Sequence, residues 1–241
     1  MFYVTGNTHA DFRRLSKSTA KSFTKDDILF VCGDFGFIWD GSDKEKKILS
    51  KLSRLKYTIA FVDGTHENFD LLNEYPVEEF YGGKVHRIAP NIVHLIRGEV
   101  FDINGCKFFA FGGGESDPED KAIRKKSNSW WEQELPDDDD IKNADTNLDK
   151  VSYEVDYIIT HEPPINANVI VNGDIKNVNH FDVYLDSLSK KLKYKKWFCG
   201  SMHIDRKITP KCFSVFASFT VPDASQESVK KKKFRWMFWK K

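Results

Sequence analysis

The chain has 241 residues, of which 40% are hydrophobic and 30% charged, a length that suits one large domain or two small ones. Its 37 Lys and Arg residues nearly balance its 36 Asp and Glu residues, so the whole chain lacks the strong positive charge typical of nucleic-acid-binding proteins. Aromatic residues make up 14%, which excludes disorder over most of the length. The sequence contains neither an apolar run of the roughly 18 to 20 residues that cross a membrane nor a secretory signal, so we expect a soluble, cytoplasmic protein.

Short apolar segments that end in Gly or polar residues alternate with amphipathic segments along the chain. The short segments are predicted to be buried strands, and they cover residues 2–6, 27–34, 57–64, 106–114, 156–162 and 196–200. Helices are predicted over residues 44–56 and 180–196, where apolar side chains recur every three or four positions. The segment 212–221 is predicted to add a last strand. Strands that alternate with helices indicate an α/β fold.

Two segments depart from this alternation. Residues from about 112 to 150 are rich in charged side chains and are interpreted as an insertion with helical pieces, in which Trp130 and Trp131 either pack or stack a nucleobase. Residues 230–241 contain seven basic and four aromatic residues. The sequence therefore predicts one domain over residues 1–229 and a basic aromatic tail. The tail either binds single-stranded nucleic acid or an anionic membrane, or packs against the domain or another subunit.

Histidine and carboxylate side chains follow the predicted strands at the points where the strands end. They are His9, Asp34, His66, His161 and His203. One histidine at such a position is more often a hydrogen-bonded surface residue than a ligand. In α/β sheets, however, ligands bind at the loops beyond the carboxyl ends of the strands, so these side chains are expected to converge. A group of imidazoles with a carboxylate suits a divalent transition metal.

The motifs at these positions resemble those of the calcineurin-like metallophosphoesterases, in particular the bacterial and phage-type members. The segments that carry the resemblance are VTGNTHADFRRL, CGDFGFIWDG, FVDGTHENFDLLN, IITHEPP and CGSMHID, and it extends from about Phe2 to Asp205. The resemblance implies a four-layer α/β/β/α sandwich with two mixed sheets. It also implies a metal site at the strand ends and the hydrolysis of phosphoesters.

In this family two metal ions lie side by side, and the resemblance implies that Asp34 bridges them. The first ion takes residues 7, 9, 34 and 203, and the second takes residues 34, 65, 161 and 201. His66 is not a ligand in this scheme but protonates the leaving group or stabilises the transition state. A hydroxide held between the metals attacks phosphorus, and the cations neutralise the developing charge.

Three of the implied ligand positions carry residues that the family does not use there. Asn7 replaces an aspartate, Thr65 replaces an asparagine and Ser201 replaces a histidine. Asn7 offers only a weak, neutral amide oxygen. The first site nevertheless keeps two imidazoles and the bridging carboxylate, so it is expected to bind a single Zn, Mn or Fe ion with reduced affinity.

The second site loses more, because only Asp34 and His161 remain of its ligands. The hydroxyl groups of Thr and Ser are poor neutral ligands for a divalent metal. A stable second ion is therefore not expected unless Glu162 or a substrate phosphate supplies oxygen. We expect one divalent ion rather than two, or none.

Two functions remain open. The first is a degenerate metallophosphoesterase with weak or absent hydrolysis, whose pocket binds a phosphate-containing ligand or a partner. The second is an active phosphodiesterase or phosphomonoesterase with a rearranged or single-metal site, which the retained His66 favours. A further alternative is a mutant of such an enzyme, because Asp to Asn replacement is a common way to silence these sites. Arg97 either clamps a substrate phosphate or forms a surface salt bridge.

Overall fold

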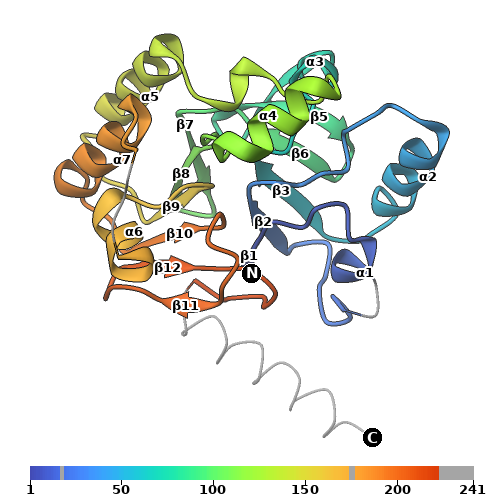
Figure 1. Cartoon of the computed structure of the whole chain (residues 1–241). Helices are drawn as coiled ribbons and strands as arrows, with labels where there is room; N and C mark the ends of the chain where they lie inside the picture. Colours follow the sequence, from blue (N-terminus) through green and yellow to red (C-terminus); the bar gives the residue numbers. More distant parts are fainter. Residues whose placement is uncertain (17–18, 174–176, 223–241) are drawn as a thin grey trace, which may run out of the picture.

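The computed structural model of the chain describes residues 1–16, 19–173 and 177–222 and contains two six-stranded sheets (Figure 1). Across the first sheet the strands are β1 (Phe2–Gly6), β2 (Ile28–Cys32), β3 (Thr58–Val62), β6 (Ile92–Leu95), β5 (Gly83–Ala89) and β4 (Val77–Phe80). Across the second sheet they are β11 (Arg206–Lys207), β12 (Cys212–Ser214), β10 (Lys196–Cys199), β9 (Tyr157–Thr160), β8 (Cys106–Phe111) and β7 (Glu99–Ile103).

Both sheets are mixed. In the first sheet β1, β2, β3 and β6 run parallel, and β5 and β4 add an antiparallel hairpin at one edge. In the second sheet β8, β9, β10 and β12 run parallel, with β7 and β11 antiparallel at the two edges. The central parallel strands are almost continuous apolar runs, as expected for strands that are covered on both faces.

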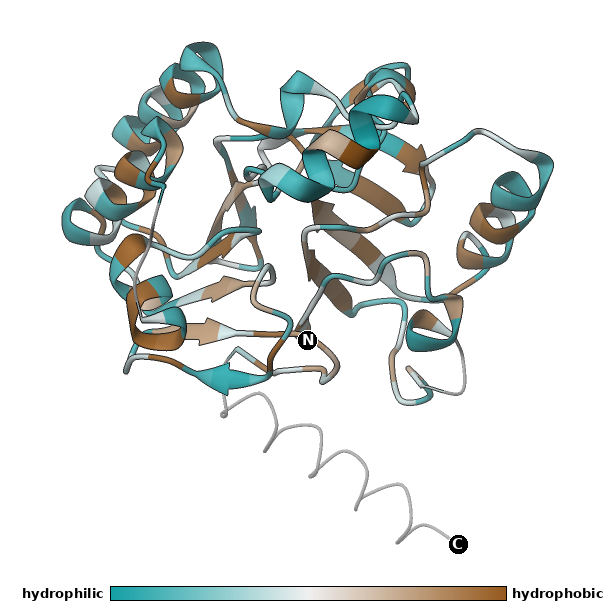
Figure 2. Cartoon of the chain, viewed as in Figure 1, coloured by the Kyte–Doolittle hydropathy of each residue, from teal (hydrophilic) through white to brown (hydrophobic). Residues whose placement is uncertain are grey.

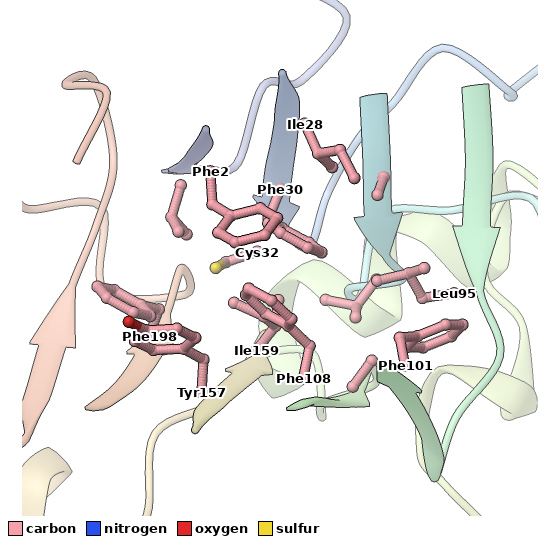
Figure 3. Close-up of a cluster of buried hydrophobic side chains, with 14 of the residues drawn as sticks. Phe2, Ile28, Phe30, Cys32, Leu95, Phe101, Phe108, Tyr157, Ile159 and Phe198 are labelled. Atoms are coloured by element: carbon pink, nitrogen blue, oxygen red, sulfur yellow. The ribbon is translucent and has the colours of Figure 1, made fainter. Parts of the chain in front are cut away.

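A core of aromatic and aliphatic side chains from both sheets fills the space between them (Figure 3). Phe30 of β2 stacks on Phe108 of β8 with the ring centroids 4.7 Å apart, and Phe2 of β1 meets the same ring edge-on at 4.8 Å. These rings come from different sheets, so their contacts hold the sheets face to face. Each fully buried ring of this size contributes roughly 1.5–3 kcal/mol.

Helices cover the outer face of each sheet, and most of them, such as those at residues 43–52 and 138–150, show a hydrophilic outer side (Figure 2). Those on the first sheet are α1 (Phe12–Leu15), α2 (Asp43–Leu52) and α3 (Phe69–Asn73). Those on the second are α5 (Asp138–Lys150), α6 (Ile165–Asn172) and α7 (His180–Lys191). The helix α4 (Pro118–Lys126) and the short 3₁₀ helix η1 (Glu132–Glu134) precede α5 within the stretch 112–150.

The predicted α/β class is confirmed, and each of the six predicted early strands is present within a few residues of its expected bounds. The helix predicted over 180–196 ends earlier, at Lys191, because β10 begins at Lys196. The last strand, predicted over 212–221, is wrong in length, since β12 ends at Ser214. The carboxylate of Asp205 accepts hydrogen bonds from the N–H groups of residues 216–218, which turns the chain away from the sheet.

Two other expectations concern segments away from the sheets. Trp131 is half-buried and donates a hydrogen bond from Nε1 to Asp70, while the half-buried ring of Trp130 lies beneath two lysine side chains of α4. Among the described residues, no helix is both long and apolar enough to cross a membrane. The tail 230–241, with its expected contacts to nucleic acid or membrane, lies outside the described residues.

Candidate metal centre

The loops that follow β1, β2 and β10 have an unusual backbone conformation. Asn7, His9, Ala10, Asp34 and His203 adopt positive φ angles of 23°, 43°, 58°, 45° and 52°. Residues other than glycine rarely occupy this region, and those that do concentrate at functional sites. Of the ten described non-glycine residues with positive φ, five lie in these three loops, which indicates a site at this edge of the sheets.

Three side chains from these loops form a compact group. His9 Nε2 lies 3.1 Å from His203 Nε2 and 3.7 Å from Asp34 Oδ2, and one ligand atom from each residue lies within 4.8 Å of the other two. Donor atoms around a tetrahedral zinc ion are about 3.3–3.5 Å apart, given bond lengths of about 2.0–2.2 Å. The group therefore has the spacing and the chemistry of three ligands, and the exposure of its two histidines leaves room for a further ligand.

Asn7 lies directly beside this group and is almost fully buried. Its Nδ2 atom is 2.7 Å from His203 Nε2 and 3.5 Å from Asp34 Oδ2, while its Oδ1 atom is buried without a hydrogen-bond partner. Turning the amide over would direct Oδ1 at the group instead. The unpartnered oxygen thus fits a fourth, neutral ligand for a cation held by the other three residues.

The charge states of the three residues suit a metal. Burial alone would raise the pKa of Asp34, but the nearby His161 and the hydrogen bonds from His66 outweigh burial and hold it well below its ordinary value. Burial lowers the pKa of both His9 and His203. A charged carboxylate and neutral imidazoles are the forms that bind metal ions.

Two residues of the expected second site, Ser201 and His161, both contact the carboxylate of Glu162. Ser201 Oγ donates a hydrogen bond of 2.8 Å to Glu162, whose other oxygen lies 3.8 Å from His161 Nε2. That nitrogen is also 4.0 Å from Asp34 Oδ1. Burial lowers the pKa of His161, but the charges of Asp34 and Glu162 more than offset burial and raise it. The structure therefore brings His161 next to the group, in an environment that favours its protonated form.

The expected acid, His66, lies at the rim of the group. Its Nδ1 atom is 3.3 Å from Asp34 Oδ2 and 3.0 Å from the hydroxyl of Thr65. On its other side, Nε2 is 3.5 Å from Asp120 of α4. Arg124, also on α4, donates a hydrogen bond of 2.8 Å to the carbonyl of Thr65. Helix α4 thus reaches over the 64–67 loop and contacts both sides of it.

Arg97 does not join the group. Its side chain is buried and donates hydrogen bonds to Asp63 at 2.6 and 3.0 Å and to Asp140 at 2.8 Å. The expectation of a surface salt bridge is therefore wrong in position, because the ion pair is buried. A substrate role would require Arg97 to release these two carboxylates. Two aspartates near the group have local roles, since Asp11 caps α1 and Asp40 accepts a hydrogen bond from the N–H of Ser42 in the turn before α2.

One residue with a clear part in the site carries no signal in the sequence beyond its place after His66. Glu67 is fully buried and accepts hydrogen bonds from the N–H groups of Phe35 at 2.6 Å and Gly36 at 3.4 Å. Burial and the charge of Asp34 raise its pKa well above the ordinary value. Glu67 therefore fixes the turn that carries Asp34.

Comparison with known proteins adds no assignment. A scan against protein-family models finds no match to the chain, and a search of curated proteins finds none. The strand-end geometry and the motifs of the sequence are therefore the features that bear on function.

Proposed function

We propose that the chain is a degenerate calcineurin-like metallophosphoesterase, with the four-layer α/β/β/α sandwich of that family. It binds one divalent ion, Mn, Fe or Zn, and a phosphate-containing ligand, and it hydrolyses phosphoesters weakly or not at all. The observation that carries the proposal is the compact group of His9, Asp34 and His203, with the unpartnered amide oxygen of Asn7 beside it. The order and spacing of the strand-end motifs support the choice of family.

One ion is favoured over two by the contacts around His161. Ser201 bonds to one oxygen of Glu162, and Thr65 bonds to His66, so neither hydroxyl group is directed at a second cation beside Asp34. A divalent ion in the first site would supply positive charge to a bound phosphoryl group, and the symmetric clamp of two ions would be missing. Weak or absent hydrolysis follows from that loss.

An active single-metal hydrolase is the second candidate. It is favoured by one observation, the position of His66 between Asp34 and Asp120, where its ring is held by carboxylates on both sides. A ring held in this way can deliver a proton to a leaving group. The two candidates share the metal and the phosphate and differ in turnover alone.

Metal binding tests the proposal directly. We expect the purified chain to bind close to one equivalent of Mn or Zn in calorimetry and in elemental analysis, and we expect His203→Ala to weaken this binding by at least about tenfold. The matched control is His180→Ala, which removes an exposed histidine outside the group.

Two outcomes would contradict the proposal. Equal metal affinity in His203→Ala and the unaltered chain would exclude His203 as a ligand. Two equivalents of metal together with saturable turnover of a generic phosphodiester would exclude the degenerate, single-metal site.

A further inference from the structure

A hollow of about 490 Å³ opens beside the group of His9, Asp34 and His203, here called the metal group. Its wall next to the group is formed by His9 and His66, so a ligand whose phosphate lies at the group extends into this hollow. The opposite wall comes from the loop before α2 and from α2 itself, and it includes Trp39, Lys44 and Ile48. The hollow therefore connects the metal group with α2.

Trp39 is well placed to receive a planar group. Its ring is half-buried and stands edge-on to Trp131, with centroids 5.9 Å apart and an angle of 74° between the planes. Its backbone is held on both sides, because its N–H donates to Glu45 at 2.7 Å and its carbonyl accepts from Asn68 at 2.6 Å. The guanidinium of Arg124 lies over the ring, 5.9 Å from its centroid, so a base of any sequence would stack on the other face of the ring.

Helix α2 carries a basic stripe that begins in this hollow. The stripe consists of Lys44, Lys47 and Lys51, which follow one another at three and four positions and so share one face of the helix, and of Arg54 in the turn after it, which lines the same concavity as Lys47 and Lys51. All four are exposed, and none forms an ion pair with another described residue. Three of them line a second concavity of about 440 Å³ farther along the helix.

The stripe is long enough, and positive enough, to contact several phosphates of one strand. Ten residues of helix span about 15 Å. Residues 43–56 hold six basic and two acidic side chains, and one of the acids, Glu45, is bound by the backbone N–H groups of residues 39–41. These residues therefore keep an excess of four positive charges, even with Asp43 beside Lys47 in the second concavity, although the whole chain is nearly neutral.

We propose that this face binds single-stranded nucleic acid. One phosphate lies at the metal group, one unpaired base stacks on Trp39, and the following phosphates run along the basic stripe. A mononucleotide would use the hollow but leave the stripe empty, and a duplex keeps its bases stacked and unavailable to Trp39. The inference rests on the proposed function only for the phosphate at the metal group, since Trp39 and the stripe bind without a metal.

Binding of a fluorescent 12-nucleotide single strand to the full chain tests the inference, with EDTA and with Mn. We expect the triple variant Lys47→Gln, Lys51→Gln, Arg54→Gln to lose at least about tenfold in affinity in both solutions. The slope of log affinity against log salt should fall by about two, because each lost phosphate contact on a single strand contributes about 0.7. The matched control is Lys142→Gln, Lys190→Gln, Lys211→Gln, which removes three exposed cations elsewhere. All variants keep residues 230–241, so any binding by that segment is common to them.

The stacking part has its own variants. Trp39→Ala should lose about tenfold in affinity with an unchanged salt slope, and Trp39→Phe should recover most of the loss. Unchanged affinity of the stripe variant relative to its control would overturn the inference, as would equal affinity for a mononucleotide or a preference for duplex. Loss of metal binding alone would overturn the proposed function and leave the EDTA result standing, so the two failures can be told apart.

Discussion

Asn7 lies beside Asp34 and His203 and affects both the stability of the metal group and its affinity for a cation. A carboxylate at this position would lie about as close to Asp34 as the amide does now, and that amide nitrogen is 3.5 Å from Asp34 Oδ2. The neutral amide removes the repulsion between two carboxylates and at the same time gives up a strong ligand. Compared with a carboxylate at position 7, the amide therefore stabilises the metal-free group and would weaken the coordination of an ion there.

Asn7→Asp should therefore change stability in opposite directions with and without metal. In EDTA we expect the variant to be less stable by about 1–2 kcal/mol, because two carboxylates at this distance repel each other, which corresponds to a melting temperature several degrees lower. With saturating Mn or Zn we expect the variant to melt higher than the unaltered chain, because it binds the ion more tightly. Thermal melts in the two solutions measure both effects.

Asn104→Asp is the matched control, since Asn104 is exposed and also has a positive φ angle. It should melt at the same temperature in both solutions. A lower melting temperature of Asn7→Asp that metal does not reverse would mean that position 7 lies outside the coordination of the ion.

At the scale of elements, α4 is the one that shapes the site from outside the sheets. Arg124 is buried and joins Thr65, Ser116 and Ser129 by hydrogen bonds of 2.8–3.0 Å, and it also faces the buried carboxylate of Glu134. These contacts tie the helix to the loop that carries His66. Without these contacts, the loop of residues 64–67 would keep the hydrogen bond from His66 N–H to Asp34 but would no longer be held against α4.

Arg124→Met should loosen that loop. We expect the backbone amides of residues 64–67 to exchange with solvent about ten- to a hundredfold faster, because each lost 1.4 kcal/mol of local stability corresponds to a tenfold faster opening. Hydrogen exchange followed by mass spectrometry measures the change. Lys126→Met on the same helix is the control, since Lys126 is exposed. Equal exchange rates of residues 64–67 in the two variants would show that the hydrogen bonds of Arg124 do not stabilise this loop.

At the scale of the whole molecule, a buried ion pair joins the first sheet to a helix that covers the second sheet. Asp63 follows β3 and Arg97 follows β6 in the first sheet, whereas Asp140 belongs to α5, which packs on the second. Burial raises the pKa of Asp63, but Arg97 and His94 more than offset burial and hold it below the ordinary value. The carboxylate therefore stays charged in the folded protein to a lower pH than in the unfolded chain.

The sign of the pH dependence follows from that depressed pKa. The stabilisation by Asp63 is fully present above about pH 4, the pKa of an unfolded aspartate, and is lost as the pH falls through the folded pKa. Asp63→Asn should cost about 3–5 kcal/mol near neutral pH, because it leaves a buried cation with one partner fewer. Urea unfolding should show this difference narrowing below about pH 4, while the exposed control Asp26→Asn stays close to the unaltered chain throughout. A pH-independent difference would contradict the ion-pair account.

Much of this architecture could be predicted from the sequence, but the long-range contacts could not. Runs such as ILFVC in β2 are apolar at every position, so they indicate buried strands by themselves. The strand β4 reads VEEF and is mostly exposed, so its pairing with β5 leaves no apolar pattern. The strand-end histidines were predictable because parallel strands end at one edge. The contact between Arg124 and Thr65 was not, because it joins positions 59 residues apart and depends on how α4 folds back.

The neighbouring imidazoles of His9 and His203 lie 194 positions apart in the chain and follow strands of different sheets. An ion held by both would act as a crosslink that closes nearly the whole sequence into a loop. By the loop-entropy relation used for disulfides, such a closure restricts the unfolded chain by about 5 kcal/mol. Removing such an ion would then weaken the packing of the two sheets against each other. Proteases would cleave the metal-free protein faster, even at sites far from His9 and His203.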